Sequence, residues 1–289
     1  MVTKVKTGIV FEGGAFRTIF SCGVMDALFE NDIMPDYMIG VSAGAAYGVS
    51  MASKQPRRNL DVLMKYRNDK RYLGLSNMID KDNKSIYGLE FSYETIPNEL
   101  NLFDYDAFKQ YKGDFYCVVT NLLTGQPEYM KYTGDDRTNT VLKATCALPM
   151  LFPPIIINDV PYMDGGLSDS IPYLKAIEDG CDRIIVVLTR QSGYTKTTSR
   201  STKAIAYSYR NQYPKLTETM LTRASRYNES LKGLDQYVKE GRIITIQPTT
   251  SKGFSRLEKD KNKILSMYND GYNQCYELLD TIKEFYGIK

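Results

Sequence analysis

Apolar positions along the chain follow two patterns, short continuous runs and longer segments with helical spacing. Short runs bounded by turn residues predict buried strands at residues 5–11, 36–41, 183–190 and 242–248. Apolar residues three or four positions apart predict helices over residues 17–30, 43–53, 59–68, 171–180, 214–240 and about 257–285. Because strands alternate with helices from the start of the chain, the pattern predicts an α/β fold with a mostly parallel sheet.

Other segments interrupt this alternation. Residues 54–112 are more polar, and we expect helices and loops that cover one side. Residues 114–133 predict two strands around a turn at 124–127, while residues 144–166 predict a helix end, a proline-rich loop and one short strand. Residues 191–202 predict a polar, mobile connection. No linker is visible, so we expect a single domain over 1–289, with the functional motifs in 1–190 and with helices and a strand in 191–289 completing it.

Charge is distributed unevenly between the two parts of the chain. The formal net charge is +3, but residues 190–289 hold 18 basic and 10 acidic side chains. Lys203, Arg210 and Lys215 are interleaved there with tyrosines. Such a segment suits contact with an anionic lipid surface, and a solvated helix face is the commoner meaning. We expect no nucleic-acid partner, and the sequence carries no signal of oligomeric state.

Composition also limits the compartment and the cofactors. The five cysteines are scattered without Cys-x-x-Cys spacing, which fits a reducing cytoplasm. The N-terminal residues lack the apolar core of a secretory signal, and no apolar stretch is long enough for a membrane span. We therefore expect a cytoplasmic protein, at most peripheral to the membrane. Without histidine or clustered cysteine, no metal site or other cofactor is expected.

The sequence GVSAG at residues 40–44 is the first candidate for chemistry. Ser42 follows an apolar strand and opens a helix, the placement that a nucleophile elbow needs. Gly40 and Gly44 avoid clashes around that turn. The alternative is a buried serine at a tight turn. Because the chain contains no histidine, a nucleophilic Ser42 must lose its proton to a base other than imidazole.

Asp164 in the sequence MDGG is the candidate base. It follows an extended segment, and Gly165 and Gly166 let the backbone pass close to another element. An ordinary carboxylate, with a pKa of about 3.9, is a weaker base than imidazole at about 6.5. Burial that raises the pKa and close proximity would offset part of this difference. The alternative is an aspartate that only caps a turn.

The sequence EGGAFR at residues 12–17 is the third candidate element. Glycines on a turn after a strand can aim N–H groups at a developing oxyanion, so Gly13 and Gly14 are the best donors, with Ala15 beside them. Arg17 is a candidate for contact with a phosphate head group, or for an ion pair with Glu12. A dinucleotide-binding turn is disfavoured because Gly-x-Gly-x-x-Gly is absent.

These motifs together resemble the patatin-like phospholipase family of bacterial type. The resemblance rests on EGGAFR, GVSAG, and FPP followed by YMDGGLSDSIP, and it covers about residues 6–190. It implies a three-layer α/β/α sandwich and a lipid acyl hydrolase in which Ser42 is the nucleophile and Asp164 its base. The family usually has a third glycine where this chain has Ala15, and a glycine where it has Thr18. Alanine keeps the N–H group but resists positive φ.

The resulting hypothesis is a serine lipid acyl hydrolase that works through an acyl-enzyme on a lipid or fatty-acyl ester. A phospholipase A, a lysophospholipase and a carboxylesterase all fit this description. Two alternatives stay open. An acyltransferase would pass the same acyl group to an alcohol, and a lipid-binding or membrane-binding module would carry a vestigial site.

Overall fold

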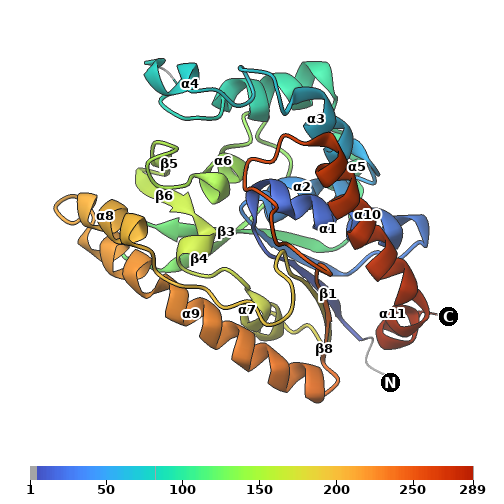
Figure 1. Ribbon diagram of the computed structural model, residues 1–289. Coiled ribbons are helices and arrows are strands. Elements are labelled where there is room, and N and C mark those ends of the chain that lie inside the picture. The colour runs from blue at the N-terminus through green and yellow to red at the C-terminus, as the bar shows by residue number, and fades with distance from the viewer. Residues whose placement is uncertain (1–4, 82, 289) are drawn as a thin grey trace.

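The computed structural model describes residues 5–81 and 83–288, and within them eight strands form one sheet (Figure 1). Five of the strands are parallel and stand side by side in the order β3, β2, β1, β7, β8. Their bounds are Asp114–Asn121, Tyr37–Val41, Thr7–Phe11, Arg183–Val187 and Ile243–Ile246. The α/β fold with a mostly parallel sheet is therefore confirmed.

The remaining strands are antiparallel and gather around β3. Strand β4 (Pro127–Lys131) pairs with one edge of β3. Strand β6 (Val160–Asp164) pairs with the last three residues of β3. It lies along the same edge of β3 as β2, which pairs with the preceding residues 114–118. Strand β5 (Ile155–Ile157) forms a hairpin with β6. The carboxyl ends of β2 and β6 consequently meet on β3.

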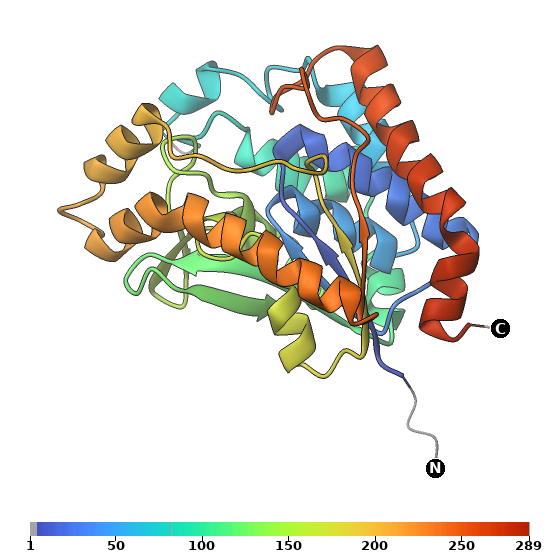
Figure 2. The same ribbon diagram turned by 60° about the horizontal axis from the view of Figure 1, so that its bottom comes forward.

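Helices cover both faces of the sheet, which makes three layers (Figures 1 and 2). Alternate residues of β1 show why, since Ile9 and Phe11 pack in the cluster that contains α1 and α10, whereas Val10 packs in the cluster that contains α7 and α9. Strands buried on both faces need continuous apolar runs, as these strands have. The covering helices are α1 (Ile19–Glu30), α2 (Ala43–Ala52), α7 (Tyr173–Glu178), α9 (Pro214–Lys239), α10 (Lys261–Glu277) and α11 (Leu279–Tyr286).

The polar segment after α2 forms a cap of helices and loops, as expected. It contains α3 (Arg58–Tyr66), α4 (Ser76–Ile79), the π-helix η2 (Phe91–Leu100) and α5 (Tyr105–Gln110). Figure 1 shows α4 and α3 at the top, above the sheet, with α6 (Thr140–Cys146) below α4.

Three expectations about local structure were wrong. The connection at 191–202 already contains the start of α8 (Arg200–Ser208), whose first turn is capped by the Ser199 hydroxyl. The last helix begins at Lys261, where Asp260 caps it, and a break at Leu278 divides it into α10 and α11. The single strand before Asp164 is a hairpin, because Asn158 and Asp159 both adopt positive φ and reverse the chain in two residues.

Helices α1 and α10 cross at two glycines. A Cβ on Gly271 would overlap the carbonyl oxygen of Phe20, and a Cβ on Gly23 would overlap that of Tyr268. The two backbones therefore touch at this crossing. The contact joins a helix next to the glycine loop to the C-terminal part of the chain.

We expect Gly271→Ala to lower the free energy of unfolding by about 2 kcal/mol or more, since the added methyl has no space at the crossing. Helix propensity alone would favour alanine by about 1 kcal/mol, so the sign of the effect is informative. Urea unfolding of the full chain measures it. Asn273→Ala, at an exposed position of the same helix, is the control and should be neutral or slightly stabilising. A stabilised Gly271→Ala variant would contradict the close crossing.

Candidate active site

Strand β3 brings Ser42 and Asp164 to the same place. Val118 pairs with Val41, the residue before Ser42, while Val119 pairs with Asp164. Strand β2 runs parallel to β3 and β6 antiparallel to it, so the two strands approach each other end to end along one edge. Residues 122 positions apart in sequence thus become neighbours through adjacent positions of a third strand.

Ser42 has the backbone of a sharp strand-to-helix turn. Its φ of 55° and ψ of −129° are unusual for a residue with a side chain, and it stands directly before α2. The turn is tight, because a Cβ on Gly40 would lie 2.5 Å from the Ala45 nitrogen and one on Gly44 would overlap the Phe11 carbonyl oxygen. Gly40 and Gly44 are therefore both required at their positions around this turn.

Thr145 holds this turn from α6, which sequence reasoning missed. The Ser42 N–H group donates to Thr145 Oγ1 at 2.9 Å, and that hydroxyl donates to the Val118 carbonyl oxygen at 2.6 Å. The strained turn is thus bonded to the strand that aligns it. No local pattern in the sequence marks Thr145 for this role.

Asp164 is buried, with 2% of its surface exposed, and is only partly hydrogen-bonded. Its Oδ1 accepts the Gly166 N–H at 2.8 Å, whereas Oδ2 is buried and has no well-formed hydrogen bond within the described residues. Burial raises the pKa of Asp164 above its usual value, and the Ser42 hydroxyl and the Arg223 guanidinium oppose part of that rise. A carboxylate that lies close to Ser42, has one unbonded oxygen and has a raised pKa is suited to accept a proton.

Gly165 and Gly166 allow the chain to turn at this point. A Cβ on Gly165 would overlap the Val118 carbonyl oxygen. One on Gly166 would lie 3.0 Å from Asp164 Oδ1 and 3.2 Å from an Arg223 guanidinium nitrogen. Both glycines keep the backbone close to β3 and to the carboxylate.

The glycine loop lies against Ser42. A Cβ on Gly13 would stand 2.8 Å from Ser42 Cβ, and one on Gly14 would stand 2.8 Å from Thr189 Oγ1. Ala15 has a φ of 51°, so this alanine does adopt the left-handed conformation that its side chain disfavours. In the part of the chain that the structure describes, no hydrogen bond from the N–H groups of these three residues to a protein acceptor is formed.

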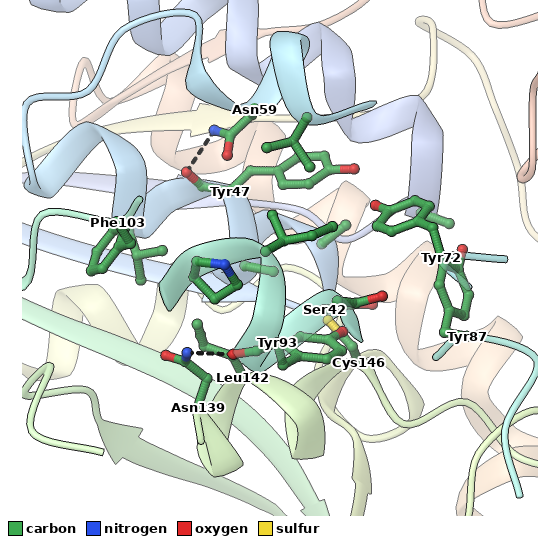
Figure 3. Close-up of a pocket in the computed structure, with 18 of the residues that line it drawn as sticks. Ser42, Tyr47, Asn59, Tyr72, Tyr87, Tyr93, Phe103, Asn139, Leu142 and Cys146 are labelled. Carbon is green, nitrogen blue, oxygen red and sulfur yellow. Dashed lines mark hydrogen bonds between the residues drawn. The ribbon is translucent and has the colours of Figure 1, made fainter. Parts of the chain in front are cut away.

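An apolar pocket opens on one side of Ser42 and has an empty volume of about 960 Å³, counting its open mouth. Figure 3 shows Ser42 beside Cys146, with the aromatic rings of the lining around the space. Ser42, Ala46 and Val49 line it from one face of α2, at helical spacing. The capping segment supplies half of the other lining residues, including Tyr72, Tyr87, Tyr93, Ile96, Pro97 and Phe103.

The tyrosines and the cysteine of this pocket stay neutral. Burial raises the pKa of Tyr47, Tyr87 and Tyr93 well above the usual value, and it raises that of the Cys146 thiol to about 12 despite hydroxyl contacts from Tyr93 and Ser42. The pocket walls therefore carry polar atoms but no anion. Sequence reasoning identified neither Cys146 nor Tyr93.

A second pocket also opens at Ser42, and its lining includes Asp164 and Arg17. Ala15, Ser42 and Leu148 line both pockets, so Ser42 stands at their junction. Arg17 forms no ion pair with Glu12 among the described residues, because Tyr227 and Thr189 hold the Glu12 carboxylate. Two roles were considered for Arg17, contact with a phosphate head group and an ion pair with Glu12. This arrangement disfavours the ion pair and leaves Arg17 available to a ligand in the pocket.

Among the described residues, no group of three or more histidine, cysteine, aspartate or glutamate side chains could hold a metal ion. No helix in that part of the chain is both long enough and apolar enough to cross a membrane.

Comparison with known proteins gives two family matches. The model of the family described as patatin-like phospholipase matches residues 9–177, and that of a domain of unknown function matches residues 213–287, where the sequence alone had suggested no family. The Escherichia coli (strain K12) protein YjjU is 27% identical over 64% of this chain and 52% of its own length. The lysophospholipase Nte1 of Aspergillus terreus is 29% identical over 63% of this chain, but over only 12% of its own length. This chain thus spans about half the length of YjjU and a much smaller share of the length of Nte1.

A solved structure, VipD from Legionella pneumophila, aligns with 96% of this chain and 67% of its own at 15% identity and a TM-score of 0.46.

We expect Asp164→Asn to raise the stability of the protein at neutral pH by about 1 kcal/mol or more, since it removes a buried charge with an unbonded oxygen. The folded-state pKa is raised, so the carboxyl stabilises the fold while protonated, and this contribution is lost as the pH rises through the folded-state pKa. The gain should therefore shrink toward low pH. Urea unfolding between pH 4 and 8 measures it, with the exposed Asp235→Asn as control. A gain independent of pH would contradict the raised pKa.

Proposed function

This chain belongs to the patatin-like phospholipase family, and from that premise we propose that it is a serine lipid acyl hydrolase in which Ser42 and Asp164 form the catalytic dyad. One observation carries the proposal: Ser42 stands at the junction of an apolar pocket and a polar one, with a buried, partly unbonded carboxylate beside it. An ester seated across Ser42 would place its acyl chain in the first pocket and its alcohol in the second.

The reaction begins when the Ser42 oxygen attacks the ester carbonyl carbon and its proton passes to Asp164. The carbonyl oxygen becomes an anion, which the N–H groups of Gly13, Gly14 and Ala15 are free to bind. As the tetrahedral intermediate collapses, the bond to the alcohol breaks and Asp164 returns the proton to the leaving oxygen. An acyl-enzyme on Ser42 remains.

Water completes the cycle. It attacks the acyl carbon while Asp164 again accepts a proton, and that proton returns to the Ser42 oxygen as the fatty acid leaves. Transfer to an alcohol in place of water would start from the same intermediate, so analysis of products with added glycerol distinguishes a hydrolase from an acyltransferase. The name of the fungal relatives supports a lysophospholipase reaction, with phospholipase A and carboxylesterase reactions as close variants.

The environment of Asp164 supports its role as a base in a protein without histidine. A raised pKa brings the carboxylate closer to the proton affinity of imidazole, and the buried Oδ2 leaves an acceptor without a strong competitor. Fixed positions on adjacent residues of β3 supply the proximity that a weaker base requires.

We expect an alkyl fluorophosphonate to label Ser42, and we expect Ser42→Ala or Asp164→Asn to abolish that labelling and to lower kcat for fatty-acyl esters at least about a thousandfold. Mass spectrometry of the labelled peptide identifies the modified residue. Ser225→Ala and Asp235→Asn, at exposed positions of α9, are the matched controls and should label normally. Normal labelling of Asp164→Asn would exclude the dyad, and absence of labelling in the folded wild type would favour a lipid-binding module with a vestigial site.

We expect Val49→Phe to shift chain-length preference. Val49 lies seven residues beyond Ser42 on α2, about 10 Å along the helix, and it lines the apolar pocket. A larger side chain there would obstruct a long acyl chain before a short one. The ratio of kcat/KM for a sixteen-carbon ester to that for a four-carbon ester should fall at least about tenfold. Turnover of the short ester shows that the variant is folded, and an unchanged ratio would place the acyl chain elsewhere.

A further inference from the structure

The second pocket beside Ser42 gathers five cationic side chains from distant parts of the chain. It has an empty volume of about 560 Å³, counting its open mouth. One cation stands just before α1, two follow β7, one lies on α9, and one precedes α10. They are Arg17, Arg190, Lys196, Arg223 and Arg256.

The two acidic residues of the pocket offset only part of this charge, and neither forms an ion pair with the cations among the described residues. Glu12 Oε1 accepts the Tyr227 hydroxyl at 2.9 Å, and Glu12 Oε2 accepts the N–H and hydroxyl groups of Thr189. Asp164 is the other acid. Within the described residues, none of the five cations lies within 4.0 Å of a carboxylate oxygen in an ion pair.

Among the five cations, Arg17 most clearly lacks a hydrogen-bond partner. It is buried, with 6% of its surface exposed, and its Nε has no hydrogen-bond partner in the described part of the chain. Burial, followed by the charges of Arg190 and Arg256, lowers the pKa of Arg17 to about 10. A buried guanidinium that lacks an acceptor is costly unless a ligand supplies one.

Two of the other cations lie over aromatic rings, which do not neutralise them. The Lys196 ammonium lies 3.7 Å from the centre of the Tyr227 ring, and the Arg190 guanidinium lies 4.5 Å from that of Tyr194. Burial lowers the pKa of Lys196 to about 7, and Arg223, Arg256 and Arg190 add to that effect while Glu12 opposes it. Like charges are thus held close together on a fixed frame, as in a preorganised anion site.

We propose that this pocket binds a phosphate monoester carried by the alcohol part of the substrate, next to the ester bond that faces Ser42. The inference rests on the proposed hydrolase function, and it names the substrate class. A phosphate monoester carries close to two negative charges and three acceptor oxygens, which suits several guanidinium groups at once. A choline-substituted phosphate would bring one negative charge and a cation, and five cations oppose that cation.

The pocket arrangement fits such a substrate. Because Ala15, Ser42 and Leu148 line both pockets, one substrate molecule at Ser42 would place its acyl chain in the first pocket and its phosphate in the second. Four of the five cations come from residues 190–289, so the positive excess of that region is partly gathered at the candidate site. Free inorganic phosphate has the same chemistry and is the competing occupant.

The test compares three esters with one acyl chain in the same uncharged micelles: 1-acylglycerol 3-phosphate, 1-acylglycero-3-phosphocholine and 1-acylglycerol. We expect kcat/KM for the phosphate monoester to exceed that for the phosphocholine ester at least about tenfold. Arg190→Gln and Arg256→Gln should each reduce this preference at least about fivefold. The exposed Arg200→Gln, outside the pocket, is the matched control and should retain the preference. Equal rates on the two phosphate-bearing esters, or equal losses on all three esters in both pocket variants, would overturn the proposal.

A binding measurement separates this inference from the hydrolase proposal. Two proteins are titrated calorimetrically, the Ser42→Ala variant and the Ser42→Ala/Arg256→Gln double variant. Each is titrated separately with glycerol 3-phosphate and with inorganic phosphate. Binding of glycerol 3-phosphate that depends on Arg256 supports the anion site even if the wild type hydrolyses none of the esters, in which case the hydrolase proposal alone fails. Turnover without such binding or preference overturns the anion site alone. Equal affinity for both anions without a substrate preference indicates a free-phosphate site and also overturns it.

Discussion

The pairing of β2 and β6 along one edge of β3 is the constraint on which the site depends. Val118 pairs with Val41, the residue before Ser42, and Val119 pairs with Asp164, so backbone pairing in the sheet sets the separation of Ser42 and Asp164. Thr145 adds a side-chain link between the Ser42 turn and Val118. A rigid sheet is a suitable support for a pair that must be placed within hydrogen-bond reach.

The region around Ser42 combines several unfavourable features that a reaction could use. Ser42 and Ala15 both hold positive φ, Asp164 is buried with an unbonded oxygen, and five cations surround one pocket without an ion pair in the described residues. Each feature lowers stability, and close packing elsewhere, as at the crossing of α1 and α10, is available to offset it. An ester with an acyl chain and an anionic alcohol would satisfy the free N–H groups, the apolar pocket and the cations together.

The sequence allowed most of the fold and the centre of the site to be predicted, because both are encoded locally. Buried parallel strands require apolar runs, and Ser42, Asp164 and their glycines occupy short recognisable motifs. The hairpin before Asp164 was missed because Asn158 and Asp159 form the turn without a glycine. Thr145, Cys146 and the convergence of Arg190, Lys196, Arg223 and Arg256 could not be found, because their roles arise from contacts between segments far apart in sequence.

The most direct test of the account is a crystal structure of the protein after reaction with a long-chain alkyl fluorophosphonate. We expect phosphorus bonded to Ser42 Oγ, a phosphonyl oxygen within hydrogen-bond distance of the N–H groups of Gly13, Gly14 and Ala15, and the alkyl chain in the apolar pocket among the tyrosines. An alkyl chain directed toward Arg190 and Arg256, or an adduct on another residue, would contradict it.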